Sequence, residues 1–351
     1  MSLAANQSGR RLMRQQISNT RDFHLPESLR IELEHGVVLA ATLHLPLESR
    51  AALFPIVLAI PGGGPSGRHS YDLLTERLNE NGIAVLEYDK RGVWQSTGKH
   101  TDEFDVQVKD SAAIVDLLRN RPEIDGDRIG VIGLCHGAMV ATLLALYEPS
   151  IAGIVMLSGP VGPRPSPFLG LVRSSLIGSG MDEPFANEIT KLIHALVEAR
   201  MACAPLSTTT NLENLLVSRL LASAFPLSEV DKMMTWLTTA EAISIWNVEP
   251  DRNLAMVRCP VLALYASIDP LVPPLAHMPA AKIALSSNPD ATIMEIASVN
   301  HIFQPGVTGS FEEMRDLGAP VQAPQVILAV VEWFVKRLSP NGVSPGSEKP
   351  N

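Results

Sequence analysis

The segment 133–137, Gly-Leu-Cys-His-Gly, limits the possible folds of this chain more than any other segment does. A short β-branched run precedes it and a run of helix formers (139–147) follows, so it is predicted to turn a strand into a helix. A Gly-x-Cys-x-Gly turn there is the layout of a nucleophile elbow, with the Cys135 thiol where a serine hydroxyl is usual. The flanking glycines let neighbouring backbone approach a strained turn. The N–H groups that begin the helix would favour a thiolate or an oxyanion; a buried, inert cysteine is the alternative.

Composition and charge narrow the possible classes of protein. The chain has 351 residues, 46% hydrophobic and 19% charged, which is enough for one large α/β domain or two smaller ones. A net charge of −9 argues against nucleic acid or anionic membranes as partners. The three scattered cysteines, Cys135, Cys203 and Cys259, predict no disulfide framework and suit a reducing cytoplasm. No Cys/His cluster has metal-ligand spacing, and we expect neither a metal nor a cofactor.

The two ends of the chain are polar. Residues 1–27 carry several arginines without the apolar segment of a signal peptide, and they are interpreted as an N-terminal arm. Residues 339–351 are rich in Pro, Gly and Ser and are predicted to form a disordered tail. No apolar stretch reaches about 18 residues without a charge or a helix breaker, so we expect no membrane span.

Predicted strands and helices alternate along the first half of the chain. Two strands, 29–34 and 37–45, bracket a turn and predict an antiparallel hairpin. The continuous apolar run 54–60 predicts a strand buried on both faces, as in a parallel sheet. The next expected elements are helix 71–80, strand 83–88, helix 104–120, the elbow with its strand and helix, and strand 151–157. This order predicts an α/β fold with a central, mostly parallel sheet.

The alternation stops between residues 160 and 246. Helical runs are predicted there at 186–202, 211–224 and 230–246, with no strand; strand 261–266, helix 275–285, strand 292–296 and helix 322–338 follow. We therefore expect a core of 28–159 and 247–338, with a helical lid (160–246) inserted after the sixth strand. Wound sheets bind ligands at the carboxyl ends of their strands, so residues of such a lid would contact substrate. The alternative is a helical appendage without substrate contact.

Two residues beyond the elbow follow later strand ends. Asp269 comes just after strand 261–266, in a loop that prolines stiffen, and His301 comes just after strand 292–296. A nucleophile needs a base and a group that orients the base, and the order nucleophile, acid, histidine is the one expected on this architecture. We therefore predict a triad of Cys135, His301 and Asp269. A turn-forming aspartate and a surface histidine are the alternatives.

The segment 61–65, Pro-Gly-Gly-Gly-Pro, follows the third predicted strand. A Gly-rich loop there can aim an N–H group at the carbonyl oxygen of a bound acyl group. We expect the N–H groups of Gly63 and His136 to be the oxyanion donors, each contributing about 3 kcal/mol, and Gly62 and Gly64 to contact substrate. A phosphate-binding loop is the alternative, but the Gly-Lys-Ser/Thr ending and the GxGxxG spacing are missing.

Other histidines and cysteines have no predicted chemistry. His277 lies at a proline-rich helix start and is expected at the surface. Cys203, at the end of a lid helix, and Cys259, which opens a buried strand, are expected to be inert.

The elbow, the Gly-rich loop 61–65, Asp269 and His301 together resemble the α/β-hydrolase superfamily. The segments 88–92 (Tyr-Asp-Lys-Arg-Gly) and 259–264 (Cys-Pro-Val-Leu-Ala-Leu) add to this resemblance. Within it, the chain resembles serine-aminopeptidase-like and dienelactone-hydrolase-like esterases over about 29–338, and the lid is the least familiar part. The resemblance implies an α/β-hydrolase fold, and it implies that Asp89 and Arg91 hold a loop beside the site.

The chain departs from the family pattern at two positions. Pro61 replaces the usual histidine at the start of the oxyanion loop, which should leave the Gly63 donor in place. Cys135 replaces the usual serine, as in the dienelactone hydrolases, and the sequence leaves open whether this thiol is native or stands in for serine.

The predicted chemistry is acyl hydrolysis through an acyl-Cys135 intermediate. A thiolate attacks well and leaves well, so thioesters and activated esters suit it better than amides. Apolar residues in 211–224 indicate a hydrophobic acyl group, on a small molecule or a carrier. The alternatives are an acyltransferase or cyclase with the same intermediate, and a non-catalytic ligand-binding protein on a hydrolase fold. The apolar lid or the N-terminal arm could support a homodimer.

Overall fold

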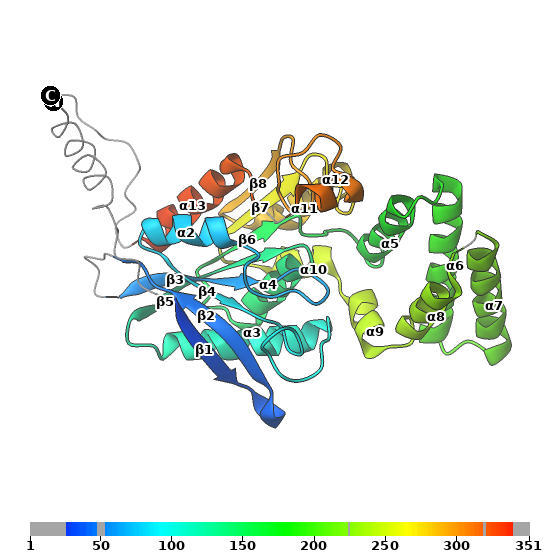
Figure 1. Ribbon diagram of the computed structural model, residues 1–351, viewed down its shortest axis with the longest axis horizontal. Helices are drawn as coiled ribbons and strands as arrows, with labels where there is room; N and C mark the ends of the chain where they lie inside the picture. The colour runs from blue at the N-terminus through cyan, green and yellow to red at the C-terminus, as the bar shows by residue number, and fades with distance from the viewer. Residues whose placement is uncertain (1–25, 48–52, 224, 319–320, 340–351) are drawn as a thin grey trace, which may run out of the picture.

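The computed structural model describes residues 26–47, 53–223, 225–318 and 321–339 (Figure 1). Nearly all of the predicted N-terminal arm (1–27) and tail (339–351) lie outside the described residues. Within the described ranges, no helix is long and apolar enough to cross a membrane.

One sheet of eight strands organises the part of the chain that is described, in the order β1-β2-β4-β3-β5-β6-β7-β8. The first two strands form the predicted antiparallel hairpin; β2 is also antiparallel to β4, and the remaining neighbours are parallel. The strands are β1 (Glu27–Glu32), β2 (Val38–His44), β3 (Phe54–Ile60), β4 (Ala84–Tyr88), β5 (Ile124–Leu134), β6 (Gly153–Leu157), β7 (Val261–Ala266) and β8 (Ala291–Ile296). This topology confirms the predicted α/β class with a mostly parallel sheet.

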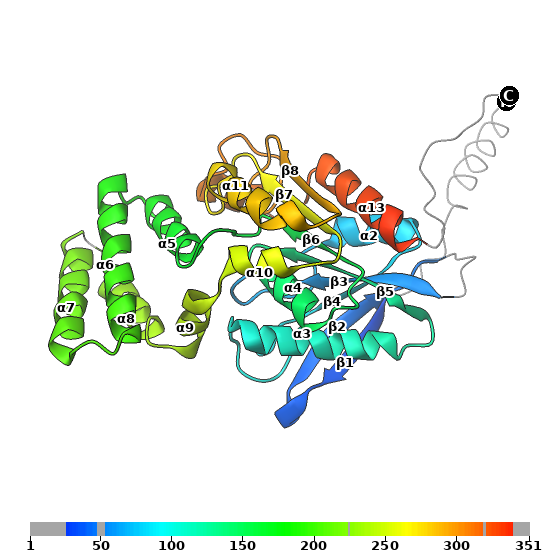
Figure 2. The same ribbon diagram turned by 180° about the vertical axis from the view of Figure 1, so that it is seen from behind.

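Helices cover both faces of this sheet (Figures 1 and 2). On one face, α2 (Asp72–Glu80) and α13 (Pro324–Leu338) bury leucine, valine and phenylalanine side chains against β3, β5 and β6. On the other face lie α3 (Phe104–Arg119), α4 (His136–Tyr147), α10 (Pro250–Met256) and α11 (Pro274–Ala284). The apolar strands are therefore buried on two sides, and loops at their carboxyl ends remain available for a site.

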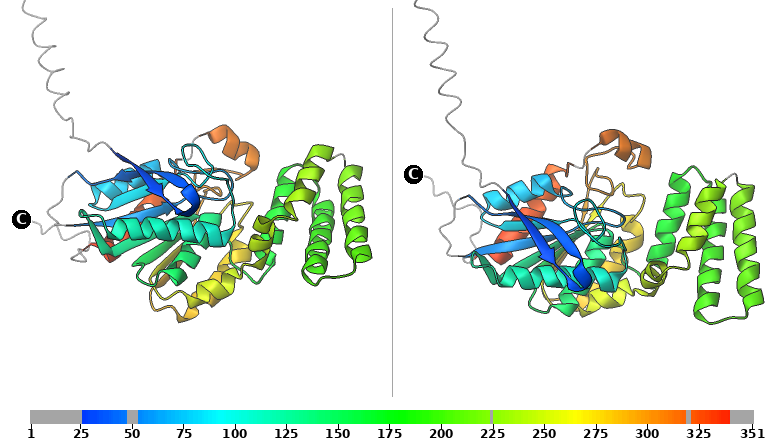
Figure 3. Two further views of the ribbon diagram at one scale, coloured as in Figure 1. Left: turned by 90° about the horizontal axis from the view of Figure 1, so that it is seen from below. Right: turned by 60° about the horizontal axis from the view of Figure 1, so that its bottom comes forward.

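Of the six helices between β6 and β7 in the described chain, the first five stand beyond the carboxyl ends of the strands (Figure 3). They are α5 (Ser166–Gly178), α6 (Glu183–Met201), α7 (Leu206–Ala222), α8 (Leu227–Trp236) and α9 (Ala240–Asn247), and we call them the helical insertion. The insertion has a core of its own, which includes Ile189, Leu216 and Trp246. Its position after the sixth strand agrees with the sequence prediction.

Some helix boundaries differ from the expectation. The segment 230–246 was predicted as one helix, but the structure divides it into α8 and α9. The side chain of Thr239 accepts a hydrogen bond from the N–H of Ala242 at 3.2 Å and so begins a new helix. The helices α5, α10 and α12 (Phe311–Leu317) were not predicted; α10 and α12 have seven residues each, too few for a clear helical period.

Candidate active site

Cys135 occupies a strained turn between β5 and α4. Its backbone has φ 53° and ψ −112°, which non-glycine residues rarely adopt. A Cβ added at Gly133 would lie 2.1 Å from the carbonyl oxygen of Gly137, and one added at Gly137 would lie 2.5 Å from that of Pro61. Both glycines are therefore required for this turn to form. The turn presents Cys135 at the N-terminus of α4, as the sequence predicts for an elbow.

Asp269 and His301 meet at the carboxyl edge of the sheet, in the loops after β7 and β8. Nδ1 of His301 lies 2.7 Å from Oδ2 of Asp269, and the residues are 7% and 4% exposed. The other oxygen, Oδ1, accepts hydrogen bonds from the N–H groups of Leu271 (2.8 Å) and Val272 (2.9 Å). Asp269 thus forms the turn proposed as its alternative role and also binds the histidine.

Asn300, the residue before His301, holds the loop that carries the histidine. Asn300 is fully buried, and its Oδ1 accepts the N–H groups of Ile302 (3.1 Å) and Gln304 (3.0 Å). Its Nδ2 donates to Oε1 of Gln304 at 3.1 Å. These bonds close a tight loop, so His301 is oriented by the backbone as well as by Asp269.

The pKa values in this group reflect its burial and its charges. Burial would lower the pKa of His301, but the negative charge of a Cys135 thiolate, hydrogen bonds to Asp269 and Cys135, and the charge of Asp269 raise it to about 10. Burial would raise the pKa of Asp269, but the hydrogen bond and charge of His301 and the N–H of Val272 hold it below its usual range. The raised pKa of His301 and the lowered pKa of Asp269 therefore favour an imidazolium paired with a carboxylate.

Two backbone N–H groups beside the thiol lack a partner. Neither the N–H of Gly63 nor that of His136 makes a hydrogen bond to any part of the chain that the structure describes. A Cβ built on Gly63 would lie 3.4 Å from the Cβ of His136, so the two segments are adjacent. By contrast, Gly64 donates its N–H to Asp102, and the carbonyl of Gly62 accepts from Ser66. The N–H of Gly64 and the carbonyl of Gly62 are thus already occupied within the protein, and the expected contact of these two glycines with substrate stays a prediction.

A cavity of about 210 Å³ opens in front of Cys135, with mainly apolar walls. The helical insertion contributes Phe168 and Leu171 from α5 and Ile245 from α9, while Met139 comes from α4. Arg164, just before α5, is a charged residue on this wall. The cavity thus lies between the sheet edge and the insertion.

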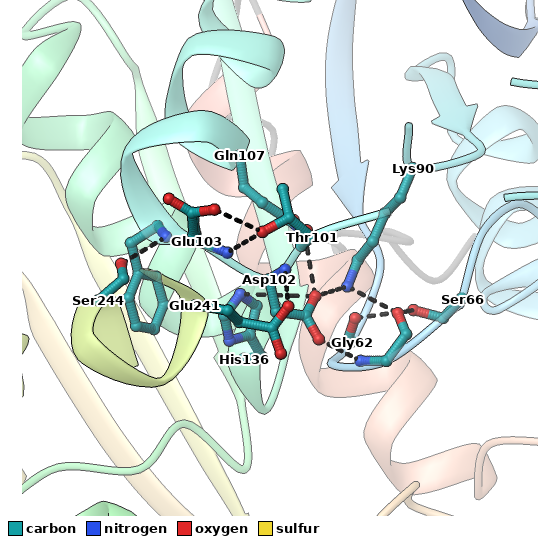
Figure 4. A network of polar contacts seen from close by, with 12 residues as sticks. Gly62, Ser66, Lys90, Thr101, Asp102, Glu103, Gln107, His136, Glu241 and Ser244 are labelled. Atoms are coloured by element: carbon teal, nitrogen blue, oxygen red, sulfur yellow. Dashed lines mark hydrogen bonds and ion pairs between the residues drawn. The ribbon is translucent and has the colours of Figure 1, made fainter. Parts of the chain in front are cut away.

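A buried ion pair that sequence reasoning missed lies under the Gly-rich loop (Figure 4). Nζ of Lys90 donates to Oδ1 of Asp102 at 2.7 Å and to the carbonyl of Gly64 at 3.1 Å. Nε2 of Gln107 donates to the same carboxylate oxygen at 3.0 Å, and the ring of His100 lies 3.0 Å from the Gly64 carbonyl. Burial lowers the pKa of Lys90, and the charge of Asp102 offsets this only in part. The position of Lys90 just after β4 was the available sequence signal.

The ring of His136 faces the same ion pair. It stacks on Phe104 with 4.4 Å between ring centroids, and its Nε2 lies 4.0 Å from Oδ1 of Asp102. Burial lowers the pKa of His136 to about 4, against the attraction of Asp102. The imidazole is therefore neutral at physiological pH.

The loop residues implied by the family resemblance form ion pairs. Asp89 accepts two hydrogen bonds from the guanidinium of Arg68, at 3.0 and 2.8 Å, and Arg91 pairs with Asp110. These bonds fix the segment after β4, in agreement with the expected structural role.

Two minor expectations have different outcomes. The prediction of a surface His277 is wrong: the residue is 6% exposed, and its Nδ1 lies 2.9 Å from the carbonyl of Val161, because the start of α11 packs under the chain leaving β6. Cys259 is half-buried, and burial raises the pKa of its thiol to about 11, which disfavours the reactive thiolate. Cys203 is exposed.

Comparison with known proteins places the chain in a family. Residues 54–302 match the family model described as serine aminopeptidase, S33. The chain is 28% identical over 155 residues to an uncharacterized protein of Pseudomonas aeruginosa (41% of each chain). It is 32% identical over 146 residues to the esterase FrsA of Yersinia enterocolitica (39% of this chain, 33% of that one) and 29% identical over 129 residues to the acyltransferase drtE of Aspergillus calidoustus (36% and 42%). These matches span less than half of each relative.

Solved structures share the fold over most of the chain. The Pyrococcus furiosus esterase Pf2001 aligns with a TM-score of 0.56 and 17% identity, over 90% of this chain and 91% of that one. DcsB, solved in complex with its substrate analogue, aligns with a TM-score of 0.56 and 15% identity, over 90% and 100%. At this identity the likeness concerns the fold alone, and it confirms the predicted α/β-hydrolase fold.

Proposed function

This chain belongs to the serine aminopeptidase (S33) family, and we propose that it is an acyl hydrolase whose nucleophile is the thiol of Cys135. The observation that carries the proposal is the contact between His301 and Asp269 at 2.7 Å, with His301 also hydrogen-bonded to Cys135 in its strained turn. A non-catalytic protein would have no need of this strain, of the buried histidine or of the two unpaired N–H groups nearby.

The proposed reaction has two halves. In the first, Sγ of Cys135 attacks the acyl carbon, and the His301 imidazolium donates its proton to the departing alkoxide or thiolate. The product is a thioester on Cys135 and a neutral imidazole. In the second, that imidazole takes a proton from water as the oxygen attacks the thioester, and the carboxylic acid leaves as the Cys135 thiolate is restored. Asp269 holds the ring throughout and stabilises its charged form.

The oxyanion of each tetrahedral intermediate needs donors that are free before the reaction. The N–H groups of Gly63 and His136 meet this requirement, because neither has a partner in the described chain. His136 also begins α4, so the helix dipole favours negative charge there. Each donor is expected to contribute about 3 kcal/mol to transition-state stabilisation.

The substrate class follows from the cavity. Its walls are formed by aliphatic and aromatic side chains such as Phe168, Leu171 and Met139, which fit a hydrophobic acyl group. Several come from the helical insertion, so we propose that the insertion acts as a lid and sets the acyl preference. A thioester or an activated ester is the preferred electrophile, because a thiolate expels such leaving groups more readily than an amine.

Acyl transfer to another nucleophile is the second candidate. The apolar cavity would limit access of water to an acyl-Cys135, and a protein similar over 129 residues is an acyltransferase. Incubation with a labelled acyl thioester and added amines or alcohols separates the two functions. Release of free acid alone, whatever acceptor is added, would exclude transfer.

Intact-mass measurement tests the proposal directly. The protein is incubated with a series of acyl thioesters and quenched in acid, and the acylated residue is located by peptide mapping. We expect one acyl group on Cys135, none in Cys135→Ala, and normal labelling in Cys203→Ser, which removes an exposed cysteine that does not line the cavity. Acylation at Cys203, or none under any condition together with an alkylation rate of Cys135 equal to that of free cysteine, would refute it.

A further inference from the structure

The amide of Gly64 is held by a carboxylate from outside its own loop. Its N–H donates to Oδ2 of Asp102 at 2.6 Å, and its carbonyl accepts from Lys90 at 3.1 Å. Gly64 has φ 74°, where a glycine is favoured. Because the peptide units before and after Gly64 are both clamped, the direction of the adjacent Gly63 N–H depends on where Asp102 lies.

Asp102 is in turn held by the helical insertion (Figure 4). Oε2 of Glu241, on α9, accepts the backbone N–H of Asp102 at 2.9 Å. Oε1 of the same carboxylate accepts Nε1–H of Trp236, on α8, at 2.8 Å. A second bond from α9 runs beside it, because Oγ of Ser244 accepts the N–H of Phe104 at 3.0 Å. The N–H of Phe104 belongs to the first turn of α3, where a helix has no acceptors of its own, and the N–H of Asp102 lies two residues before the helix; α9 supplies an acceptor to each.

The ion pair does not offer a separate ligand site. The side chain of Lys90 is 1% exposed, and its Nζ already binds Asp102 and Gly64. Oδ1 of Asp102 accepts from both Lys90 and Gln107, and Oδ2 accepts from Gly64. Lys90 and Asp102 thus bind groups within the protein, and their bonds to Gly64 fix the position of the Gly-rich loop.

We infer that Glu241 is a positioning residue that makes the oxyanion site depend on the docking of the helical insertion. In the docked state, Glu241 holds the backbone of Asp102, Asp102 holds Gly64, and the Gly63 N–H points at the reacting carbonyl. When α9 leaves, Asp102 loses its acceptor and the loop loses its orientation. The insertion therefore controls the chemical step as well as access to the cavity. The inference rests on the proposed function, because it concerns the same oxyanion donors.

Three variants distinguish the orientation of the oxyanion loop by Glu241 from a role that only attaches α9 to the core. Glu241→Ala removes the acceptor, whereas Glu241→Gln keeps one amide oxygen that can accept the Asp102 N–H. Ser244→Ala is the matched control, because it removes the neighbouring bond between α9 and α3 without touching Asp102. Each is compared in two reactions at Cys135: acylation by an acyl thioester, which develops an oxyanion, and alkylation by iodoacetamide, which does not.

We expect Glu241→Ala to slow acylation at saturating thioester by about tenfold, since a displaced donor costs much of its contribution. Its alkylation rate and its KM should stay within about twofold of the original protein, and Glu241→Gln and Ser244→Ala should keep most of the acylation rate. An unchanged acylation rate in Glu241→Ala would overturn the inference. An equal fall in acylation and alkylation would also overturn it, because Glu241 would then only maintain the fold.

A second measurement does not require activity. Hydrogen exchange of the peptide covering 61–66 should be faster in Glu241→Ala than in Ser244→Ala, because the Gly64 N–H loses the support of Asp102. Equal exchange in the two variants would contradict the inference. Failure of the proposed function has a different signature: Cys135 of the unaltered protein would not be acylated at all, while the dependence of 61–66 exchange on Glu241 would still be observed.

Discussion

Nδ1 of His301 lies 2.7 Å from Oδ2 of Asp269, across 32 positions of sequence. A carboxylate only accepts hydrogen bonds, so Nδ1 carries the hydrogen and Nε2 is left for the thiol of Cys135. The second oxygen of Asp269 is fixed by two backbone N–H groups, and the ring therefore has one favoured orientation. The pKa of His301 is consequently the quantity that pH experiments on this site should report.

The pH dependence of kcat/KM should have an alkaline limit near pH 10. His301 donates a proton to the leaving group, and the protonated fraction of the imidazole falls as pH rises through its pKa of about 10. Asp269→Asn removes a charge that helps to raise this pKa, so the limit should move to lower pH. The rate should also fall on the order of 100-fold or more, because the ring loses its favoured orientation. An alkaline limit that stays in place in Asp269→Asn would count against the proposed role of Asp269.

Replacement of the thiol by a hydroxyl tests whether Cys135 is the native nucleophile. A serine hydroxyl is not ionised by a neighbouring imidazole as a thiol is, so Cys135→Ser should lower thioester hydrolysis by at least about 100-fold. Cys135→Ala should remove the acyl intermediate and serves as the baseline. A gain in ester hydrolysis in Cys135→Ser would instead indicate that the surrounding site is adapted to serine.

The parts of the site that could be predicted are those whose cause is local or topological. Gly133 and Gly137 flank the elbow because a Cβ on either would lie within 2.5 Å of backbone atoms. This requirement can be recognised from the five-residue motif 133–137 alone. Asp269 and His301 could be predicted because parallel strands end at one edge, so residues that follow different strands converge. These rules need no knowledge of side-chain packing.

The parts that could not be predicted depend on contacts between distant segments. Glu241 binds the backbone N–H of Asp102 across 139 positions, and a backbone donor has no side-chain signature. The apolar spacing of 230–246 continues through Thr239, so the sequence pattern does not indicate that α8 ends before this residue. The side chain of Thr239 caps the N-terminus of α9 and so begins a separate helix. His277 was misplaced because a proline-rich helix start resembles a surface segment, whereas here it packs against Val161.

Stability should fall as the solution is acidified from about pH 6.5 to pH 4. Burial lowers the pKa of His136 to about 4, so in this range the unfolded chain binds a proton that the folded chain does not. Protons therefore favour the unfolded state, and the contribution lost is on the order of 2–3 kcal/mol. Urea unfolding at pH 7 and pH 4.5 checks this. His136→Gln, which cannot titrate, should lose less stability between the two pH values; equal losses would mean that other groups dominate.

The acyl preference should change when the cavity is made shorter from the side of the insertion. Leu171 lies on α5 and lines the cavity, so Leu171→Trp should occupy volume that a long acyl chain requires. A methylene in an apolar pocket is worth about 1–3 kcal/mol, and kcat/KM for long-chain thioesters should therefore fall by tenfold or more while short-chain activity is kept. Leu215→Trp is the matched control, because Leu215 is 44% exposed on α7 and does not line the cavity. A uniform loss across all chain lengths in Leu171→Trp, or the same profile in both variants, would place the acyl group elsewhere.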